Sequence, residues 1–238
     1  MARKAKASKP SANGKKELLR QTMLDAAAKL FAERGFAGTN LQDIADALGT
    51  SRPLLYYYFP NKEEILASLV EEVTVSSQHQ STRIAVSTDT NPGETLRFMT
   101  ASHAKLLLDH AVAFRVVDRS EADLPAAIRK VHDTAKRAVF DNFSSVIARG
   151  AQIGHFRPVD PQLSAFGILG MCSWTAWWFK PSGRLSLQQV ADGIADLAVH
   201  SVQRQEARRP KTSAISDALQ ILREDIDHLE LVTKSRSG

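Results

Sequence analysis

The 238-residue sequence has almost no cysteine and no long apolar run. Its single cysteine, Cys172, excludes an internal disulfide framework and suits a reducing compartment. The longest mainly apolar stretch, Ala165 to Phe179, contains Ser173 and Thr175 and falls short of the roughly 20 residues that a membrane span needs. Polar residues follow the basic N-terminus, which argues against a secretory signal. We therefore expect a soluble, cytoplasmic protein without a membrane partner.

The sequence also lacks the motifs of common enzymes and metal sites. It contains no Gly-x-Ser-x-Gly elbow, no GxGxxG loop and no P-loop. Its seven histidines show neither HxxxH nor HExxH spacing, which argues against a metal site. No catalytic residue, metal ion or cofactor is therefore expected.

Positive charge is concentrated in the first quarter of the chain. Residues 1–62 hold 11 Lys/Arg and 5 Asp/Glu, whereas residues 63–238 hold 20 and 21. The first 16 residues form a basic arm without an acidic side chain. Such a segment either binds a polyanion or serves as a disordered, solubilising tail, and the arm alone does not distinguish the two.

Apolar residues at helical spacing cover most of the chain, and no hairpin signal interrupts them. Thr39 and Gln42 predict a Thr-x-x-Gln capping box that opens a short helix. Gly49 ends this helix, and Thr50 or Ser51 caps the next one. Two short helices joined by a tight turn are the helix-turn-helix pattern, in which the second helix enters the major groove of DNA.

All three tyrosines of the chain stand together on this second short helix, as Tyr56, Tyr57 and Tyr58. Because a helix turns by about 100° per residue, they cannot all face one core. Leu55 and Phe59 mark the buried face. We therefore expect Tyr58 to be partly buried and Tyr56 and Tyr57 to be exposed.

The chain beyond Pro60 reads as longer amphipathic helices, predicted over residues 62–83, 95–109, 111–119, 124–152, 161–179 and 187–203. A last helix, with a coiled-coil spacing from Ile215 to Leu229, is too short to be stable unless it docks. The expected organisation is all-α. It comprises a basic arm (1–16), a helix-turn-helix domain (17–62), a larger helical domain (63–205), and a linker with an extra amphipathic helix (206–238).

The segment AAAKLFAERGFAGTNLQDIADALGTSRPLLYYYFPNKEEIL resembles the DNA-binding domain of the TetR family of bacterial transcriptional regulators. The similarity runs from about Leu18 to Leu69. It includes the Phe-x-x-x-Gly end of the first helix, the Leu-Tyr-Tyr-aromatic-Phe run and the Asn-Lys-Glu-Glu that follows. Thr50 and Pro53 depart from the common valine and small residue, and Tyr58 replaces a common histidine. The resemblance implies an all-α homodimer that represses transcription until a small effector releases it from an operator.

The resemblance also implies which side chains contact DNA. Tyr56, Tyr57, Thr39 and Lys62 would bind phosphates, although a solvated lysine is the simpler interpretation of Lys62. Ser51, Arg52 and Leu54 would read base edges. The full predicted set is Thr39, Asn40, Thr50, Ser51, Arg52, Leu54, Tyr56, Tyr57 and Lys62.

The C-terminal half contains GILGMCSWTAWWFKPSGRLSLQQVADGIADLAV, with a Trp-x-x-x-Trp-aromatic-x-Pro-x-Gly pattern. It is similar to a subgroup that includes regulators of lipid, sterol and fatty-acyl-CoA catabolism. The implied effector is a small hydrophobic molecule, with an acyl-CoA thioester as one candidate. The expected dimer contacts are Gly167, Gly170, Trp174 and Trp177, and the expected effector contacts are Phe98, His103, Phe114, Arg115, Phe143 and Trp178.

Simpler interpretations remain open for these residues. The tryptophans could be core residues, His103 a hydrogen-bonded core residue, and Arg115 part of a solvated face. Three other functions also remain. The chain could be a multidrug-sensing repressor of an efflux system, an all-α enzyme with a non-functional helix-turn-helix, or an interaction protein in which that motif is structural only.

Overall fold

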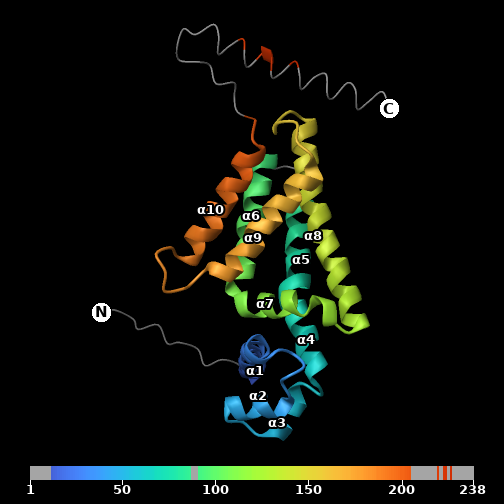
Figure 1. Cartoon of the computed structure of the whole chain (residues 1–238), viewed down its shortest axis with the longest axis vertical. Helices are drawn as coiled ribbons and strands as arrows, with labels where there is room; N and C mark the ends of the chain where they lie inside the picture. Colours follow the sequence, from blue (N-terminus) through green and yellow to red (C-terminus); the bar gives the residue numbers. More distant parts are fainter. Residues whose placement is uncertain (1–11, 87–90, 205–218, 220–221, 224–225, 227–238) are drawn as a thin grey trace, which may run out of the picture. The chain divides into compact units, whose positions relative to one another are not determined.

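In a computed structural model, the described part of the chain comprises residues 12–86 and 91–204, with residues 219, 222, 223 and 226. Almost all of it is helical (Figure 1), which confirms the all-α fold class. Among the described residues, no helix is both long and apolar enough to cross a membrane. The helices are α1 (Ala12–Arg34), α2 (Leu41–Leu48), α3 (Arg52–Tyr58), α4 (Lys62–Val70), α5 (Ser76–Ala85), α6 (Pro92–Asp109), α7 (Ala111–Arg119), α8 (Ala126–Gln152), α9 (Pro161–Trp178) and α10 (Leu187–Val202).

The predicted stops and caps of the short helices are largely confirmed. Gly35 and Gly49 follow α1 and α2 with φ of 77° and 61°, the left-handed conformation that favours glycine. Ser51 caps α3, and Pro53 lies in its first turn. The capping box of α2, however, is formed by Asn40 and Asp43. The prediction that placed it on Thr39 and Gln42 was wrong by one residue.

The long helix predicted over residues 62–83 is interrupted. A π-helical turn, η1 (Glu71–Val75), separates α4 from α5. Such turns insert one extra residue per turn and occur often at functional sites. A short 3₁₀ turn, η2 (Glu121–Asp123), likewise precedes α8.

The described residues up to Gln203 belong to one compact unit. One buried cluster joins α1–α4 to the neighbouring ends of α6, α7, α9 and α10, through residues such as Met23, Leu55, Leu66, Val116 and Cys172. Burial raises the pKa of the Cys172 thiol to about 12, as expected of a small apolar core residue. A second cluster lies among α5, α6, α8, α9 and α10. Packed side chains therefore cross the predicted domain boundary at residue 62.

The two chain ends lie mostly outside the described residues. Helix α1 begins at Ala12, so the last residues of the predicted basic arm (1–16) are helical, while residues 1–11 are not described. In the predicted linker and C-terminal helix (206–238), only Leu219, Leu222, Arg223 and Ile226 are described, all helical.

Candidate functional site

Helix α3 presents the surface that the sequence assigns to DNA. Tyr57 is 68 % exposed and Tyr56 is 39 % exposed, whereas Leu55 is fully buried. Tyr58 is half-buried against the core, as predicted. Ser51, Arg52 and Leu54 are also exposed. The helix thus offers two phenolic hydroxyls and a short polar N-terminus to an outside partner.

Two cations lie beside the exposed tyrosines. The Arg52 guanidinium donates to the Tyr56 hydroxyl at 2.9 Å and lies 5.2 Å from the centre of that ring. The Lys16 ammonium, from α1, donates to the Tyr57 hydroxyl at 3.3 Å. Because cations attract phosphate oxygens, each tyrosine–cation pair presents a hydroxyl and a positive charge that suit a phosphate. Sequence reasoning did not link Lys16 to α3, since the two are far apart in the chain.

Thr39 and Lys62 both bond to the turn between α1 and α2, and the phosphate contact of Lys62 stays a prediction. Thr39 is buried, and its hydroxyl donates to the Gly35 carbonyl at 2.9 Å. It therefore holds the turn after α1, which corrects the expectation that it offers its hydroxyl to a phosphate. The Lys62 ammonium donates to the Phe36 and Thr39 carbonyls at 3.0 and 3.3 Å. It fastens the start of α4 to the α1–α2 turn rather than standing free in solvent.

The two remaining predicted DNA contacts flank α2. Asn40 is exposed, and its side chain accepts from the Asp43 backbone N–H at 3.0 Å. Thr50 is half-buried, and its backbone N–H donates to the Ala45 carbonyl at 3.0 Å. Both residues shape the ends of α2, and their DNA contacts stay predictions.

The larger helical region contains a partly open cavity of about 320 Å³. This volume is near the lower end of the range for small-molecule sites. Helices α5–α9 and the turns η1 and η2 all contribute to its wall. The lining residues are Val73, Thr74, Ser77, His103, Leu107, Phe114, Val117, Asp118, Glu121, His132, Lys136, Val139, Phe140, Phe166, Leu169, Gly170 and Ser173.

The structure brings only two of the six predicted effector contacts, His103 and Phe114, to this cavity. Phe98 is 61 % exposed, because five residues along a helix turn its side chain well away from the face of His103. Phe143 is fully buried, and its ring packs edge-on against the His103 ring at 5.9 Å rather than lining the wall.

The other two predicted contacts lie elsewhere. The Arg115 guanidinium donates to the Ala176 carbonyl at 2.6 Å, which ties α7 to α9. Trp178 ends α9 with its ring about half exposed. The expected effector contacts are therefore corrected to exclude Phe98, Arg115, Phe143 and Trp178 from the cavity wall.

One end of the cavity is polar. The Lys136 ammonium contacts both carboxylate oxygens of Glu121, at 2.7 and 2.8 Å. Burial acts to raise the pKa of Glu121, but the Lys136 hydrogen bond and the nearby positive charge outweigh it, so the pKa is lowered. Burial and the charge of Lys136 lower the pKa of His132, against the opposing effect of Glu121. Burial alone lowers the pKa of His103 to about 4. Both histidines are therefore neutral at pH 7.

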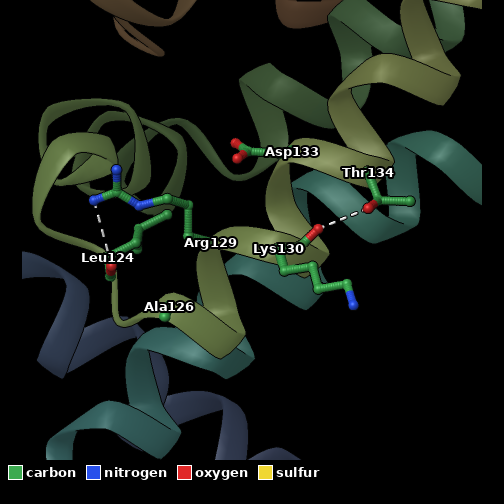
Figure 2. Close-up of a pocket in the computed structure, with 6 residues that line it drawn as sticks. All are labelled: Leu124, Ala126, Arg129, Lys130, Asp133 and Thr134. Atoms are coloured by element: carbon green, nitrogen blue, oxygen red, sulfur yellow. Dashed lines mark hydrogen bonds between the residues drawn. The ribbon is translucent and has the colours of Figure 1, made fainter.

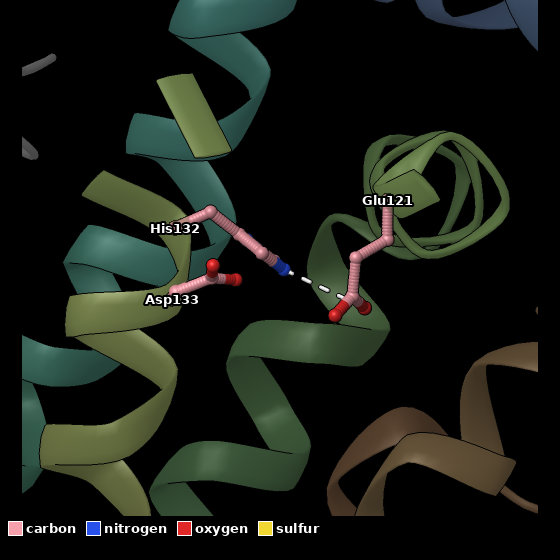
Figure 3. Close-up of side chains that lie close together, drawn as sticks. All are labelled: Glu121, His132 and Asp133. Atoms are coloured by element: carbon pink, nitrogen blue, oxygen red, sulfur yellow. Dashed lines mark ion pairs between the residues drawn. The ribbon is translucent and has the colours of Figure 1, made fainter. Parts of the chain in front are cut away.

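Figure 3 shows the His132 ring directed at Glu121, with Asp133 beside it. One ligand atom from each of these three residues lies within 4.8 Å of the others, a grouping that suits a metal ion. Lys136, however, already donates to both oxygens of Glu121, and its positive charge would repel a divalent cation there. The grouping therefore serves better as a polar end of the cavity than as a metal centre.

A second, open hollow lies on the outside of the α8 N-terminus (Figure 2). Leu124, Ala126, Arg129, Lys130, Asp133 and Thr134 line it. The Arg129 guanidinium donates to the carbonyls of Ala122 and Leu124, and the Thr134 hydroxyl donates to the Lys130 carbonyl. These bonds join neighbouring residues of η2, the short connection after it and α8, so they stabilise the local structure.

Helix α9 carries an exposed apolar stripe. Leu163, Phe166, Trp174 and Trp178 are all exposed large hydrophobics, and Gly167 and Gly170 lie between them. A Cβ added at either glycine would meet nothing within 4 Å. Trp177, by contrast, is half-buried under the Arg119 guanidinium, which lies 4.9 Å from its ring centre. Contiguous exposed apolar surface of this kind is typical of a protein–protein interface.

The π-helical turn η1 touches both the cavity and α1. Val73 and Thr74 line the cavity. The adjacent Glu72 accepts from the Gln21 amide of α1 at 2.7 Å and from His110 Nδ1 at 2.8 Å. A change in the position of this turn would therefore alter both the cavity wall and the contact with α1.

These features define a class of protein: a helix-turn-helix unit joined to a helical region with a ligand-sized cavity. Residues 23–69 match the family described as "Bacterial regulatory proteins, tetR family", and residues 89–202 match the "Tetracyclin repressor-like, C-terminal domain". The chain belongs to the TetR family and is a DNA-binding transcriptional regulator, not an enzyme. The resemblance found in the sequence is thereby confirmed.

Three relatives indicate how far the similarity extends. The chain is 31 % identical over 178 residues to the HTH-type transcriptional repressor KstR2 of Mycobacterium tuberculosis. The matched region covers 72 % of this chain and 86 % of that protein. The regulator PfmR from Thermus thermophilus matches with 30 % identity, a TM-score of 0.67, and coverage of 76 % of this chain and 99 % of that one. AibR, solved with isovaleryl coenzyme A and operator DNA, matches with 32 % identity, a TM-score of 0.61, and coverage of 75 % and 96 %.

Proposed function

We propose that this protein is a homodimeric repressor that binds a pseudo-palindromic operator and is released by a small hydrophobic effector. The observation that carries the proposal is the mainly apolar cavity of about 320 Å³ behind the helix-turn-helix unit. One relative, KstR2, is a repressor, and another, AibR, was solved with isovaleryl coenzyme A, an acyl-CoA thioester, and operator DNA. A thioester is therefore one candidate effector, with its acyl part in the cavity and the much larger coenzyme outside.

The stripe on α9 supplies the proposed dimer contact. Two copies would pack Gly167, Gly170 and Trp174 against the same surface of the partner around a two-fold axis. The small residues allow the two helices to approach closely, and the tryptophan supplies apolar area. A two-fold dimer presents two α3 helices, which favours an operator with half-sites about 34–36 Å apart.

The turn η1 offers a route from the effector to DNA. Occupation of the cavity would press on Val73 and Thr74, while Glu72 in the same turn holds Gln21 of α1. An effector acts by binding more tightly to a conformation in which the two α3 helices no longer match successive major grooves. A hundredfold loss of operator affinity requires a preference of about 2.7 kcal/mol for that conformation.

The test is a titration of labelled DNA from just upstream of the gene, repeated at rising salt. We expect nanomolar-range specific binding that weakens steeply with salt, because the contacts release counterions from phosphates. A thermal-shift screen of free acids, sterols and acyl-CoA thioesters then supplies ligands for release assays. If only polar cationic drugs stabilise the protein and free it from DNA, the multidrug-sensing alternative replaces the lipid-type effector.

A further inference from the structure

The cavity contains an unusual set of polar atoms. Among the described residues, four buried side-chain polar atoms have no hydrogen-bond partner: Ser77 Oγ, His103 Nδ1, His132 Nε2 and one guanidinium nitrogen of Arg149. Three of the four belong to residues that line this one cavity. Buried polar atoms are nearly always paired, because leaving one unpaired costs about 1–3 kcal/mol. Their gathering around an apolar space indicates that something in that space pairs with them.

The charges around the cavity exclude several kinds of ligand. Lys136 is engaged by both oxygens of Glu121, and Asp118 adds a further carboxylate to the wall. A ligand carboxylate would therefore meet repulsion without a free cation to offset it. The unpaired atoms belong to a hydroxyl and two neutral imidazoles, groups that recognise neutral oxygens as well as donors. His132 Nε2 lies 3.7 Å from Glu121 Oε2, beyond hydrogen-bonding distance, and has no hydrogen-bond partner.

We infer that the part of the effector held in the cavity is a neutral, mainly apolar group that carries a ketone or alcohol oxygen, bound by Ser77, His103 and His132. This inference rests on the proposed function, and it narrows the effector from hydrophobic molecules in general. Pure hydrocarbon chains leave the three polar atoms unpaired, and free acids meet the carboxylates. The apolar body of the ligand packs against Leu107, Phe114, Val139 and Phe140.

The test uses the full-length protein without DNA and three probes on one ring skeleton. These are 4-tert-butylcyclohexanone, tert-butylcyclohexane and 4-tert-butylcyclohexanecarboxylic acid, with affinities measured by calorimetric titration. His103→Phe keeps a ring beside Phe143 but removes both nitrogens, and Ser77→Ala removes the hydroxyl. Each variant should weaken ketone binding by about 3- to 10-fold, the scale of one lost hydrogen bond. Hydrocarbon binding should stay the same or tighten, and the acid should bind more weakly than the ketone throughout.

Ser81→Ala is the matched control, because Ser81 is also buried on α5 but its hydroxyl donates to the Gln78 carbonyl. It should leave the affinity for all three probes unchanged. The inference is overturned if the variants shift the ketone and the hydrocarbon equally, if the acid binds most tightly, or if none of the probes binds. Operator release is measured separately. If the ketone binds but does not release the protein from its operator, the inference about the cavity stands and the proposed effector-controlled repression is contradicted. If only acids release the protein from its operator, the proposed repression stands and the inference about the cavity is overturned.

Discussion

The described buried polar groups of the helix-turn-helix unit are hydrogen-bonded, whereas several around the cavity have an atom without a partner. Thr39 is buried with its hydroxyl bonded to the Gly35 carbonyl, and Lys62 bonds two carbonyls of the same turn. Around the cavity, by contrast, Ser77 and His103 each hold an atom without a partner. In the helix-turn-helix unit these buried polar groups find their hydrogen-bond partners within the unit itself, which suits a rigid DNA-binding domain. In the second region, the proposed ligand would supply the missing hydrogen bonds, and these bonds would add to its affinity.

The largest expected effect on operator affinity comes from substitutions in the larger helical region, on α9, far from the helix-turn-helix unit in the sequence. Gly167→Glu with Trp174→Glu places charges on the exposed stripe of α9, where a Cβ at Gly167 would meet nothing within 4 Å and Trp174 is 66 % exposed. The fold should survive, but two like-charged surfaces would no longer pack. We expect monomers in sedimentation analysis and at least a ~100-fold loss of operator affinity, because each monomer contacts only one half-site.

Val131→Glu is the matched control for this change, since Val131 is an exposed apolar residue on α8, outside the stripe. It should leave both the dimer and operator binding intact. A native protein that sediments as a monomer at micromolar concentration would contradict the α9 interface.

The next largest effect on DNA affinity should come from substitutions within the helix-turn-helix unit. Replacing Tyr56 and Tyr57 together with Phe keeps both rings and removes the hydroxyls beside Arg52 and Lys16. If the hydroxyls contact phosphates, operator affinity should fall by about 1–3 kcal/mol for all DNA sequences alike. Fluorescence titration with operator and with unrelated DNA measures this loss. Tyr58→Phe, half-buried against the core, is the control and should leave affinity unchanged.

The helix-turn-helix unit was predictable because its information is local. Glycine stops, the cap of α3 and apolar residues at positions i, i+3 and i+4 lie within a few residues of the structures that they specify. Even so, the α2 cap was misplaced by one residue. Asn40 and Asp43 form a capping box as readily as Thr39 and Gln42 would, and only packing shows that Thr39 turns inward.

The cavity was far less predictable because its wall depends on pairings between distant segments. His103, His132 and Ser77 come from three helices, and sequence spacing cannot show that they face one space. Phe98 was expected there for its apolar character, yet the rotation of α6 turns it outward. The π-helical turn η1 also left no recognisable signal, although it shifts the register of every residue after it in α5.

The smallest expected effect lies where the two regions meet, at Glu72 and His110. The hydrogen bond that His110 donates to Glu72, together with the Glu72 charge, raises the pKa of His110, against the opposing effect of partial burial. Burial acts to raise the pKa of Glu72, but His110 and Gln21 lower it overall. A histidine with a raised folded pKa contributes stability that is complete below its unfolded value of 6.5 and is lost as pH rises through the folded pKa.

The free energy of unfolding, measured with urea at pH 6 and pH 8.5, should therefore contain a contribution from this pair that falls as pH rises. Because His110 is about one-third exposed, we expect less than about 1 kcal/mol. His110→Gln should remove this part of the pH dependence, whereas His79→Gln, at an exposed site on α5, should leave it unchanged. If the free energy of unfolding of His110→Gln has the same pH profile as that of the native protein, the Glu72–His110 pair does not link the two regions. The link would then depend on the hydrogen bond between Glu72 and Gln21 alone.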